Sequence, residues 1–414
     1  MTRRLRIALL SRWYWEENRR SGTAEGGAVQ QLAEAMADLG HEVVVLSQSP
    51  HVRALEKSQV GKLEVWFSPR DKKHDLITGL RDKWAKRTYH HRKLHSDALA
   101  LRDFLAQCGP FDVIWTQGEE PDGLVAGFAR QLGMTLPPVL IQIYALRYRF
   151  ENGVPHFQEK PALRLAFRHA DRILANSELV AASLSTYADG LLTVEKLQAK
   201  THFVPPNLQH EFFQTAASTD RATTAEPNRV LFLGALNEKK GATVFMEAVR
   251  KTAVSKKGAV FVVVGGFTER NPSFARRWEA TVEAAQTELA PVQVELLGKI
   301  PAAETIRQIQ RANVVVLPSL FDEFSRALVE ALILGRPVIT TKTVGAWPLV
   351  SEHACGLVVE PNDPDALARA IDDILAPGTP YAANAQAVAH RLACEYTPEA
   401  IARQIAQHLE EIAL

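Results

Sequence analysis

The sequence is poor in the features that identify several large classes of protein. Its 414 residues include only three cysteines, Cys108, Cys355 and Cys394, which lie far apart and are odd in number. They predict neither a disulfide framework nor a metal site, and they fit a reducing compartment. The apolar run at residues 7–10 is too short for a signal peptide. No window approaches the length of a membrane span, so we expect a cytoplasmic protein.

A strong net charge is also missing. The chain has 48 Lys and Arg against 47 Asp and Glu, a formal charge of +1, which argues against a general nucleic-acid binder. The charge is uneven, however. Residues 1–206 hold 28 basic against 23 acidic residues and residues 207–414 hold 20 against 24, so we expect an anionic partner to meet the first half. No G-x-G-x-x-G follows the first predicted strand, which counts against a dinucleotide oxidoreductase.

Repeated apolar runs are what the sequence does contain. Hydrophobic residues make up 46% and charged residues 23% of the chain, as in soluble globular proteins. Short Val-, Ile- and Leu-rich runs alternate with helical patterns in both halves, and near-continuous runs are typical of parallel strands covered on both faces. The predicted strands span residues 6–11, 42–47, 113–116, 139–143, 171–176, 229–234, 259–266, 292–298, 314–317 and 338–340.

This alternation predicts an α/β protein with two doubly wound, Rossmann-like domains that face each other across a cleft. A chain of 414 residues exceeds what one core usually serves. We expect a first domain at residues 1–213 and a second at 229–395. The stretch 214–228 is rich in Ala, Ser, Thr, Asp and Pro and is predicted to be the linker. Residues 396–414 are predicted to form a final helix, which Thr397-Pro398-Glu399 begins.

The stretch from Ser319 to Thr340 carries the main functional signal. Asp322 and Glu323 follow the strand 314–317 and precede a predicted helix, for which Ser325 is the expected N-cap. Parallel sheets bind ligands at this edge, and a helix N-terminus attracts phosphate. Glu330 lies inside the helix between apolar neighbours, where a carboxylate needs a partner or a ligand hydroxyl.

The spacing Asp322-x7-Glu330 resembles the acidic-x7-Glu motif of retaining GT-B glycosyltransferases of family 4, also called group 1. The usual text is E-G-F-G-x-x-x-x-E-A, and this chain has D-E-F-S-R-A-L-V-E-A. The resemblance implies that Asp322 and Glu323 orient the donor sugar. It also implies that the amides at Phe324 and Ser325 hold the diphosphate and that Glu330 holds the ribose.

A second motif supports this resemblance. Residues 234–241 read G-A-L-N-E-K-K-G, which is similar to the family's G-R-L-x-x-x-K-G. This similarity implies a donor loop that contains Gly234 and Asn237 and places Lys240 on the diphosphate. The family's Arg is Ala235 here, and we expect Arg326 to supply the missing charge. Lys299 and Ile300 stand where the family borders the nucleotide base.

The first half resembles the family's first domain. Gly26 and Gly27 are expected on the donor side, as the Gly-Gly pair that precedes the helix at residues 28–39, and G-H-E-V follows at residues 40–43. The family's His after the strand 139–143 is Tyr144 here, so Tyr144, Arg147 and Glu119 are the candidates for the acceptor side. The GT-B fold also implies that the final helix crosses back to the first domain.

The implied function is that of a metal-independent hexosyltransferase. Such an enzyme moves a sugar from a nucleoside diphosphate sugar to a hydroxyl of a glycan, a lipid-linked or a small-molecule acceptor, with no bound cofactor and no nucleic acid. Two alternatives stay open. A GT-B sugar-nucleotide epimerase releases product without an acceptor, and a non-catalytic sugar-nucleotide-binding protein binds without turnover.

Residues 70–97 form a basic segment in which Leu76, Leu80 and Trp84 recur every four residues. One interpretation is a solvated helix packed on the domain. The other is a surface helix that makes peripheral contact with an anionic membrane or an anionic acceptor.

Overall fold

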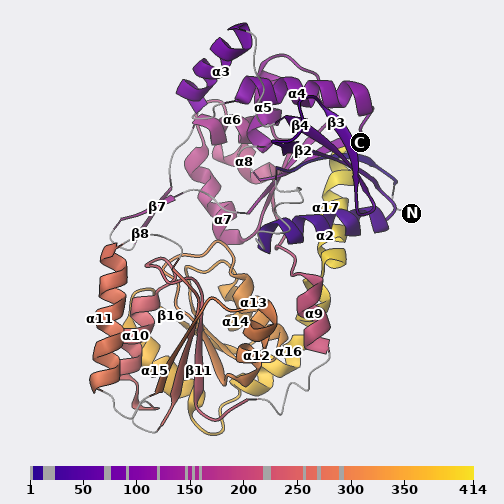
Figure 1. Cartoon of the computed structure of the whole chain (residues 1–414). Helices are drawn as coiled ribbons and strands as arrows, with labels where there is room; N and C mark the ends of the chain where they lie inside the picture. Colours follow the sequence, from indigo (N-terminus) through magenta and orange to yellow (C-terminus); the bar gives the residue numbers. More distant parts are fainter. Residues whose placement is uncertain are drawn as a thin grey trace. The chain divides into compact units, whose positions relative to one another are not determined.

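The structure is a computed structural model of the whole chain (Figure 1). It describes residues 3–12, 24–69, 76–89, 93–118, 122–144, 148–151, 154–157, 161–217, 225–254, 258–267, 272–288 and 293–414. The chain divides into two compact units. Unit 1 comprises Met1–Arg147, Phe157–Gln209 and Pro398–Leu414, and unit 2 comprises Tyr148–His156 and His210–Thr397.

Unit 1 is built on a sheet that contains β1 (Arg6–Leu10), β2 (Glu42–Ser49), β3 (Glu56–Val60), β4 (Leu63–Pro69), β5 (Val113–Gln117), β6 (Val139–Ile143), β9 (Arg172–Ala175) and β10 (Thr201–Phe203). The strand order is β10-β9-β6-β5-β1-β2-β4-β3. Neighbouring strands pair in parallel, except for the antiparallel pair β3 and β4. The chain begins in the middle of the sheet and then proceeds to one edge and afterwards to the other, so the sheet is doubly wound.

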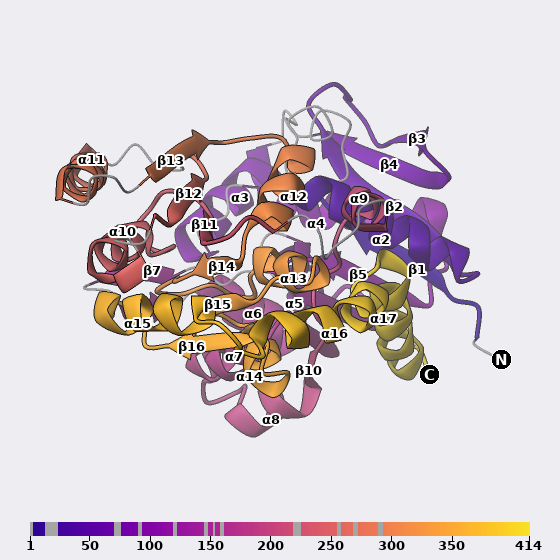
Figure 2. The same cartoon turned by 90° about the horizontal axis from the view of Figure 1, so that it is seen from below.

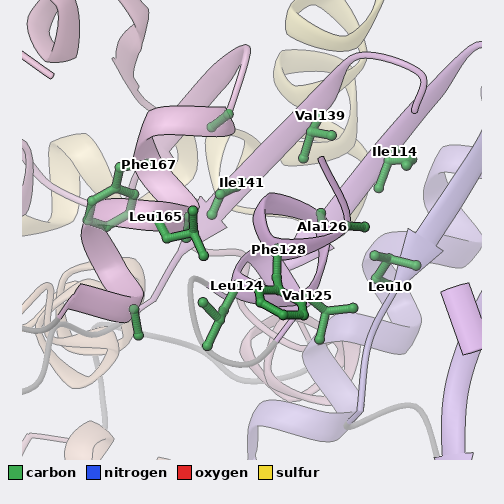
Figure 3. Close-up of a cluster of buried hydrophobic side chains, with 14 of the residues drawn as sticks. Leu10, Ile114, Leu124, Val125, Ala126, Phe128, Val139, Ile141, Leu165 and Phe167 are labelled. Carbon is green, nitrogen blue, oxygen red and sulfur yellow. The ribbon is translucent and has the colours of Figure 1, made fainter. Parts of the chain in front are cut away.

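Helices cover both faces of this sheet because successive side chains of its central strands, which point to opposite faces, are apolar. On β1, Ile7 and Leu9 join a core cluster with α2 (Ala24–Asp38) and α17 (Pro398–Ile412), which lie side by side in Figure 1. Ala8 and Leu10 join the cluster on the other face. Figure 3 shows Leu10 in that second cluster, near side chains of α5. The helices of this face are α4 (Leu94–Cys108), α5 (Leu124–Gln131) and α6 (Pro161–His169), and the unit also has α3 (Leu76–Tyr89), α7 (Glu178–Ser183), the short 3-10 helix Leu184–Tyr187 and α8 (Val194–Lys200).

Unit 2 has a second parallel sheet, formed by β11 (Arg229–Leu233), β12 (Val260–Val264), β13 (Gln293–Gly298), β14 (Val314–Leu317), β15 (Val338–Thr341) and β16 (Gly356–Val359). Its order is β13-β12-β11-β14-β15-β16, which Figure 2 shows across the unit. The helices are α9 (His210–Ala217), α10 (Ala242–Lys251), α11 (Pro272–Glu288), α12 (Ala302–Arg311), α13 (Arg326–Ile333), α14 (Trp347–Glu352), α15 (Pro364–Leu375) and α16 (Tyr381–Glu395), and β7 (Tyr148–Glu151) pairs with β8 (Val154–Phe157).

The prediction of two doubly wound α/β sheets is confirmed, and two local predictions are wrong. Gly26 and Gly27 do not precede the first helix but lie in the first turn of α2, which begins at Ala24. Residues 214–217 are not linker, because α9 continues to Ala217 through Ala-rich sequence that favours helix. The edge strand β3 was not predicted, because four of its five residues are exposed and polar and show no apolar pattern.

Candidate functional site

The loops that follow β11 and β14 meet at the carboxyl edge of the unit 2 sheet. These two strands are neighbours at the point where the strand order reverses, which is where open α/β sheets bind ligands. The amide of Leu320 donates to the carbonyl oxygen of Lys239 at 2.8 Å. Gly241 has φ +69°, and a Cβ there would lie 2.0 Å from the carbonyl oxygen of Pro318. Only glycine therefore lets the two loops approach so closely.

Two lysine–carboxylate pairs join these loops. Lys240 Nζ lies 2.5 Å from Asp322 Oδ2, and Lys239 Nζ lies 3.0 Å from Glu323 Oε2. The carboxylate side chains are 11% exposed, and the lysine side chains are 26% and 29% exposed for Lys240 and Lys239. The structure thus brings Lys240 together with Asp322 and Glu323, from positions about 80 residues apart. Lys239 was not predicted, because the motif has its lysine at position 240 and only the contact with Glu323 distinguishes Lys239.

Asn237 and Gly234 belong to the lysine loop, residues 234–241, which follows β11 and contains Lys239 and Lys240. The side-chain oxygen of Asn237 accepts a hydrogen bond from the amide of Lys240 at 2.9 Å. The amide of Gly234 donates to the carbonyl oxygen of Val264, and a Cβ on Gly265 would lie 1.8 Å from the carbonyl oxygen of Gly234. A Cβ on Gly234 itself would make only ordinary contacts, 3.7 Å from Phe232 at the nearest. The Asn237 side chain thus holds the backbone at Lys240 by a hydrogen bond, whereas Gly234 is not required by close packing.

The acidic loop, residues 318–325 with Asp322 and Glu323, contacts the lysine loop and also the turn after β15. The amide of Asp322 donates to the carbonyl oxygen of Thr343 at 3.0 Å, and the amide of Gly345 donates back to the carbonyl oxygen of Asp322 at 2.9 Å. The Phe324 side chain is 4% exposed, and its ring centroid lies 6.1 Å from that of Tyr396. Because Phe324 is buried, its side chain serves packing, and only its backbone is suited to a ligand.

Ser325 stands at the start of α13, but the prediction that its side chain caps this helix is wrong. The residue has φ 74° and ψ 84°, and its hydroxyl makes no capping hydrogen bond. An N-cap that accepts from the first turn normally has extended backbone, which a positive φ prevents. The family's preference for glycine at this place has the same physical basis. Arg326 is the first residue of the helix.

Glu330 lies one turn further along α13 and is half-buried. Burial raises the pKa of its carboxyl group, and the positive charge of Arg326 partly opposes this rise. The charged form of Glu330 is therefore costly in the isolated protein, and hydroxyl donors from a ligand would stabilise it.

Lys299 and Ile300 follow β13, two strands away from the lysine loop in the sheet. Lys299 is exposed and Ile300 is half-buried. The amide of Gly265 donates to the carbonyl oxygen of Gly298 at 2.9 Å, which links the loops after β12 and β13. Lys299 and Ile300 thus lie at the same carboxyl edge of the sheet as Lys240. They are separated from Lys240 along that edge, because β12 lies between β13 and β11.

The acceptor-side candidates belong to unit 1. Tyr144 follows β6, and its hydroxyl donates to Gln117 Oε1 at 2.5 Å at the end of β5. The Asn176 side chain donates to the carbonyl oxygen of Tyr144 at 2.6 Å. Tyr144 is therefore fixed at the carboxyl edge of the unit 1 sheet. Glu119 and Arg147 lie outside the described residues.

A second polar cluster lies in unit 1, and the sequence did not indicate it. Arg12, which follows β1, donates from Nη2 to Asp97 Oδ2 at 2.8 Å, and its Nε lies 3.8 Å from Asp122 Oδ1. Burial raises the pKa of Asp97, and it raises that of Asp122 to about 6, although Arg12 opposes both shifts. The three side chains line a cavity of about 30 Å³, which is room for about two water molecules. No motif marks these residues, because they come from three distant loops and helices.

Family models match both halves of the chain. The model described as glycosyl transferases group 1 matches residues 227–377, and the model described as glycosyl transferase 4-like domain matches residues 26–189. Together they cover most of the sequence. Among the described residues, no helix combines the length and apolar character that crossing a bilayer requires.

Individual relatives and solved structures agree with these matches. The chain is 25% identical over 370 residues to the putative colanic acid biosynthesis glycosyltransferase WcaL of Escherichia coli, covering 81% of this chain and 84% of that protein. It is 24% identical over 390 residues to the MMP alpha-(1->4)-mannosyltransferase of Mycolicibacterium hassiacum, covering 90% and 89%. The crystal structure of Anabaena HepE in complex with UDP shares the fold, with a TM-score of 0.67, 16% identity and coverage of 98% and 100%. The chain therefore belongs to the group 1 glycosyltransferases and has the GT-B fold.

Proposed function

We propose that the protein moves a hexose from a nucleoside diphosphate sugar to a hydroxyl acceptor, with retention at the anomeric carbon and without a bound metal. The observation that carries this proposal is the two lysine–carboxylate pairs at the switch point of unit 2, the position between β11 and β14 where the strand order reverses. Two cations beside the N-terminus of α13 form the kind of site that binds a pyrophosphate. The neighbouring carboxylates suit the hydroxyls of a sugar.

Donor binding exchanges the partners of both lysines. A pyrophosphate is more negative than one carboxylate, so it draws the ammonium group of Lys240 away from Asp322. The same exchange at Lys239 releases Glu323. The freed carboxylates then accept hydrogen bonds from the sugar hydroxyls. Binding of the pyrophosphate and orientation of the sugar are coupled in this way through shared ion pairs.

The same groups act in the chemical step. The bond between the anomeric carbon and the phosphate oxygen breaks, and negative charge grows on the leaving diphosphate. Lys240, Lys239 and the amides at Phe324 and Ser325 stabilise this charge, which is usually the largest catalytic contribution. The acceptor oxygen forms its bond to the anomeric carbon on the same face, and its proton passes to the leaving phosphate oxygen.

The remaining donor contacts follow the family resemblance. Glu330 holds the ribose, and the backbone at Lys299 and Ile300 borders the base. Arg326 replaces the cation that the family has at position 235. The glycines of the donor side are Gly26, Gly27 and Gly234.

The acceptor contacts are proposed for unit 1. Tyr144, Glu119 and Arg147 are the candidates to line the acceptor side, at a cytoplasmic location. UDP sugars are the first donors to test, because HepE binds UDP in its crystal structure.

Calorimetric titration with UDP, GDP and ADP sugars, followed by a nucleotide-release assay, tests the proposal. Lys240→Ala should weaken binding of the donor by about 10- to 100-fold, since a charge-assisted hydrogen bond contributes about 1.5–3 kcal/mol. Arg326→Ala should raise the donor KM about tenfold, and Ala235→Arg in that background should restore part of the loss.

The matched control is Lys251→Ala, since Lys251 also pairs with a carboxylate but lies at the far end of α10. Equal effects of the two lysine variants on donor affinity would refute the pyrophosphate site. Binding without any release of nucleotide, whichever acceptor is offered, would instead identify a sensor. Conversion of the sugar without an acceptor would identify an epimerase.

A further inference from the structure

Helix α3 presents apolar side chains to solvent. Ile77 is 63% exposed, Leu80 is 56% exposed and Trp84 is 53% exposed. With a rotation of about 100° per residue, these three side chains fall within about 60° of one another on the helix surface. The other large exposed apolar residues described in unit 1, among them Leu132, Leu191 and Phe203, come from separate elements. The stripe on α3 is therefore an apolar patch, and such patches commonly mark contact surfaces.

Basic residues border this stripe on both sides. By the same rotation, Arg81 lies on one side of it, and Arg87 and Lys83 lie on the other. Lys86 is exposed as well. Long basic side chains beside exposed aromatic and aliphatic groups are typical of helices that lie in a membrane interface.

The opposite face fixes the helix on unit 1. Thr78, Asp82, Ala85 and Tyr89 are buried and follow the spacing of one helix face. The Asp82 carboxylate accepts hydrogen bonds from the backbone amides of His95 and Ser96 at 2.9 and 3.2 Å, at the start of α4. Asp82 is the only acidic residue of α3. Because it is turned inward, the exposed face carries positive charge only.

We propose that α3 docks unit 1 on an anionic phospholipid surface, with Ile77, Leu80 and Trp84 entering the headgroup region. The charge complementarity between the basic borders and phospholipid headgroups selects this partner. The apolar stripe adds area that leaves water on contact, which a soluble polyanion would not provide. Figure 1 shows α3 at the margin of unit 1, and the burial of its residues separates one packed face from one exposed face. This inference does not depend on the proposed glycosyl transfer.

Flotation of the purified full-length chain with vesicles tests the proposal. One set contains phosphatidylcholine with about one third phosphatidylglycerol, and the other contains phosphatidylcholine alone. We expect binding to the anionic vesicles, little binding to the neutral ones, and release at high salt, because salt screens exposed charges. Each basic residue near such a surface contributes about 1 kcal/mol, so the triple variant Arg81→Gln, Lys83→Gln, Arg87→Gln, which removes the three residues that border the stripe, should lose on the order of 100-fold in partitioning.

A matched control removes the same number of charges elsewhere. Arg276→Gln, Arg369→Gln and Arg403→Gln change exposed residues on α11, α15 and α17, and this triple variant should partition within about threefold of the unchanged chain. Tryptophan fluorescence adds a direct readout of insertion. Emission should shift to shorter wavelength when anionic vesicles are added, and Trp84→Phe should remove most of that shift.

Several results would overturn the proposal. One is failure of the unchanged chain to float with anionic vesicles at low salt. Others are equal binding to neutral vesicles, or equal losses in the two triple variants. A fluorescence shift that persists in Trp84→Phe would place the contact elsewhere on the chain. Thermal unfolding of each variant confirms that the comparison is made between folded proteins.

Discussion

The two units place opposite charges at the same point of the same kind of sheet, but in different proportions. In unit 2, Lys239 and Lys240 follow β11 and pair with Glu323 and Asp322, which follow β14. In unit 1, Arg12 follows β1, and Asp122 follows β5 across the corresponding reversal of strand order. Unit 2 thus has one cation for each carboxylate, whereas unit 1 has a single arginine between two aspartates.

The charge balance, and not the exposure of the cations, distinguishes the two sites. The unit 2 lysines and Arg12 are about equally exposed, at 26%, 29% and 28%, but each lysine pairs with one carboxylate and Arg12 is shared by two. Arg12 is bound by Asp97 and Asp122, whose side chains are 11% and 9% exposed, and burial raises the pKa of both. The same topology therefore holds two separate ion pairs in one unit and, in the other, a single arginine beside two carboxyl groups whose pKa is raised by burial.

Removing the cation from each of the two sites should have the largest effects. Arg12→Ala leaves two buried carboxyl groups without their cation, so it should lower the free energy of unfolding by about 2–4 kcal/mol. Lys240→Ala leaves Lys239 in the same site and should lower it by about 1 kcal/mol or less, with its main effect on donor affinity. Denaturant unfolding of both variants measures this. A larger stability loss for Lys240→Ala would contradict the assignment of the two roles.

The titration of Asp122 should have an intermediate effect on stability. Its pKa in the folded protein is about 6, above the value of 3.8 for an ordinary Asp. The folded state therefore binds more protons than the unfolded state between these values, and the contribution of this group to stability is lost as pH rises through that window. Asp122→Asn cannot ionise, so it should gain about 1–3 kcal/mol relative to the unchanged chain between pH 4 and pH 7.

Unfolding measured at both pH values gives this difference. Asp103→Asn is the control, because Asp103 is an exposed aspartate on α4 that pairs with its neighbour Arg102. An Asp122→Asn effect that is the same at both pH values would show that burial does not shift this carboxyl group.

The smallest expected effect on stability comes from residues with positive φ in the loops that follow β5 and β14. Gly118 follows β5 with φ +113°, and Ser325 lies in the loop after β14 with φ 74°. Side chains are strained in this region, so Ser325→Gly should raise the free energy of unfolding by up to about 1 kcal/mol, whereas Ser325→Val should lower it by about 1–2 kcal/mol. Equal melting temperatures for the two variants would argue against strain at Ser325.

The sequence predicted most of the strands and helices but not every contact in the site. Continuous apolar runs mark buried strands such as β12 and β14, because both faces of a parallel sheet are covered and exclude water. The edge strand β3 has no such run. Ser325 was expected to cap α13, because its residue type favours that role, and the local backbone prevented it. Lys240 was predicted from a motif, whereas Lys239 has the same residue type and only its contact with Glu323 distinguishes it.

The fold class and the family could be predicted from the amino-acid order alone, because apolar runs and motif spacing are properties of residues close together in the chain. Which charges meet depends on tertiary folding, since Arg12, Asp97 and Asp122 come from distant parts of the chain and no local pattern links them. Tertiary folding also decided which side of α3 is left uncovered, because the anchoring of Asp82 on α4 depends on packing between two helices. Local sequence patterns predict the helices and strands, and contacts between distant loops determine which charged side chains form a site.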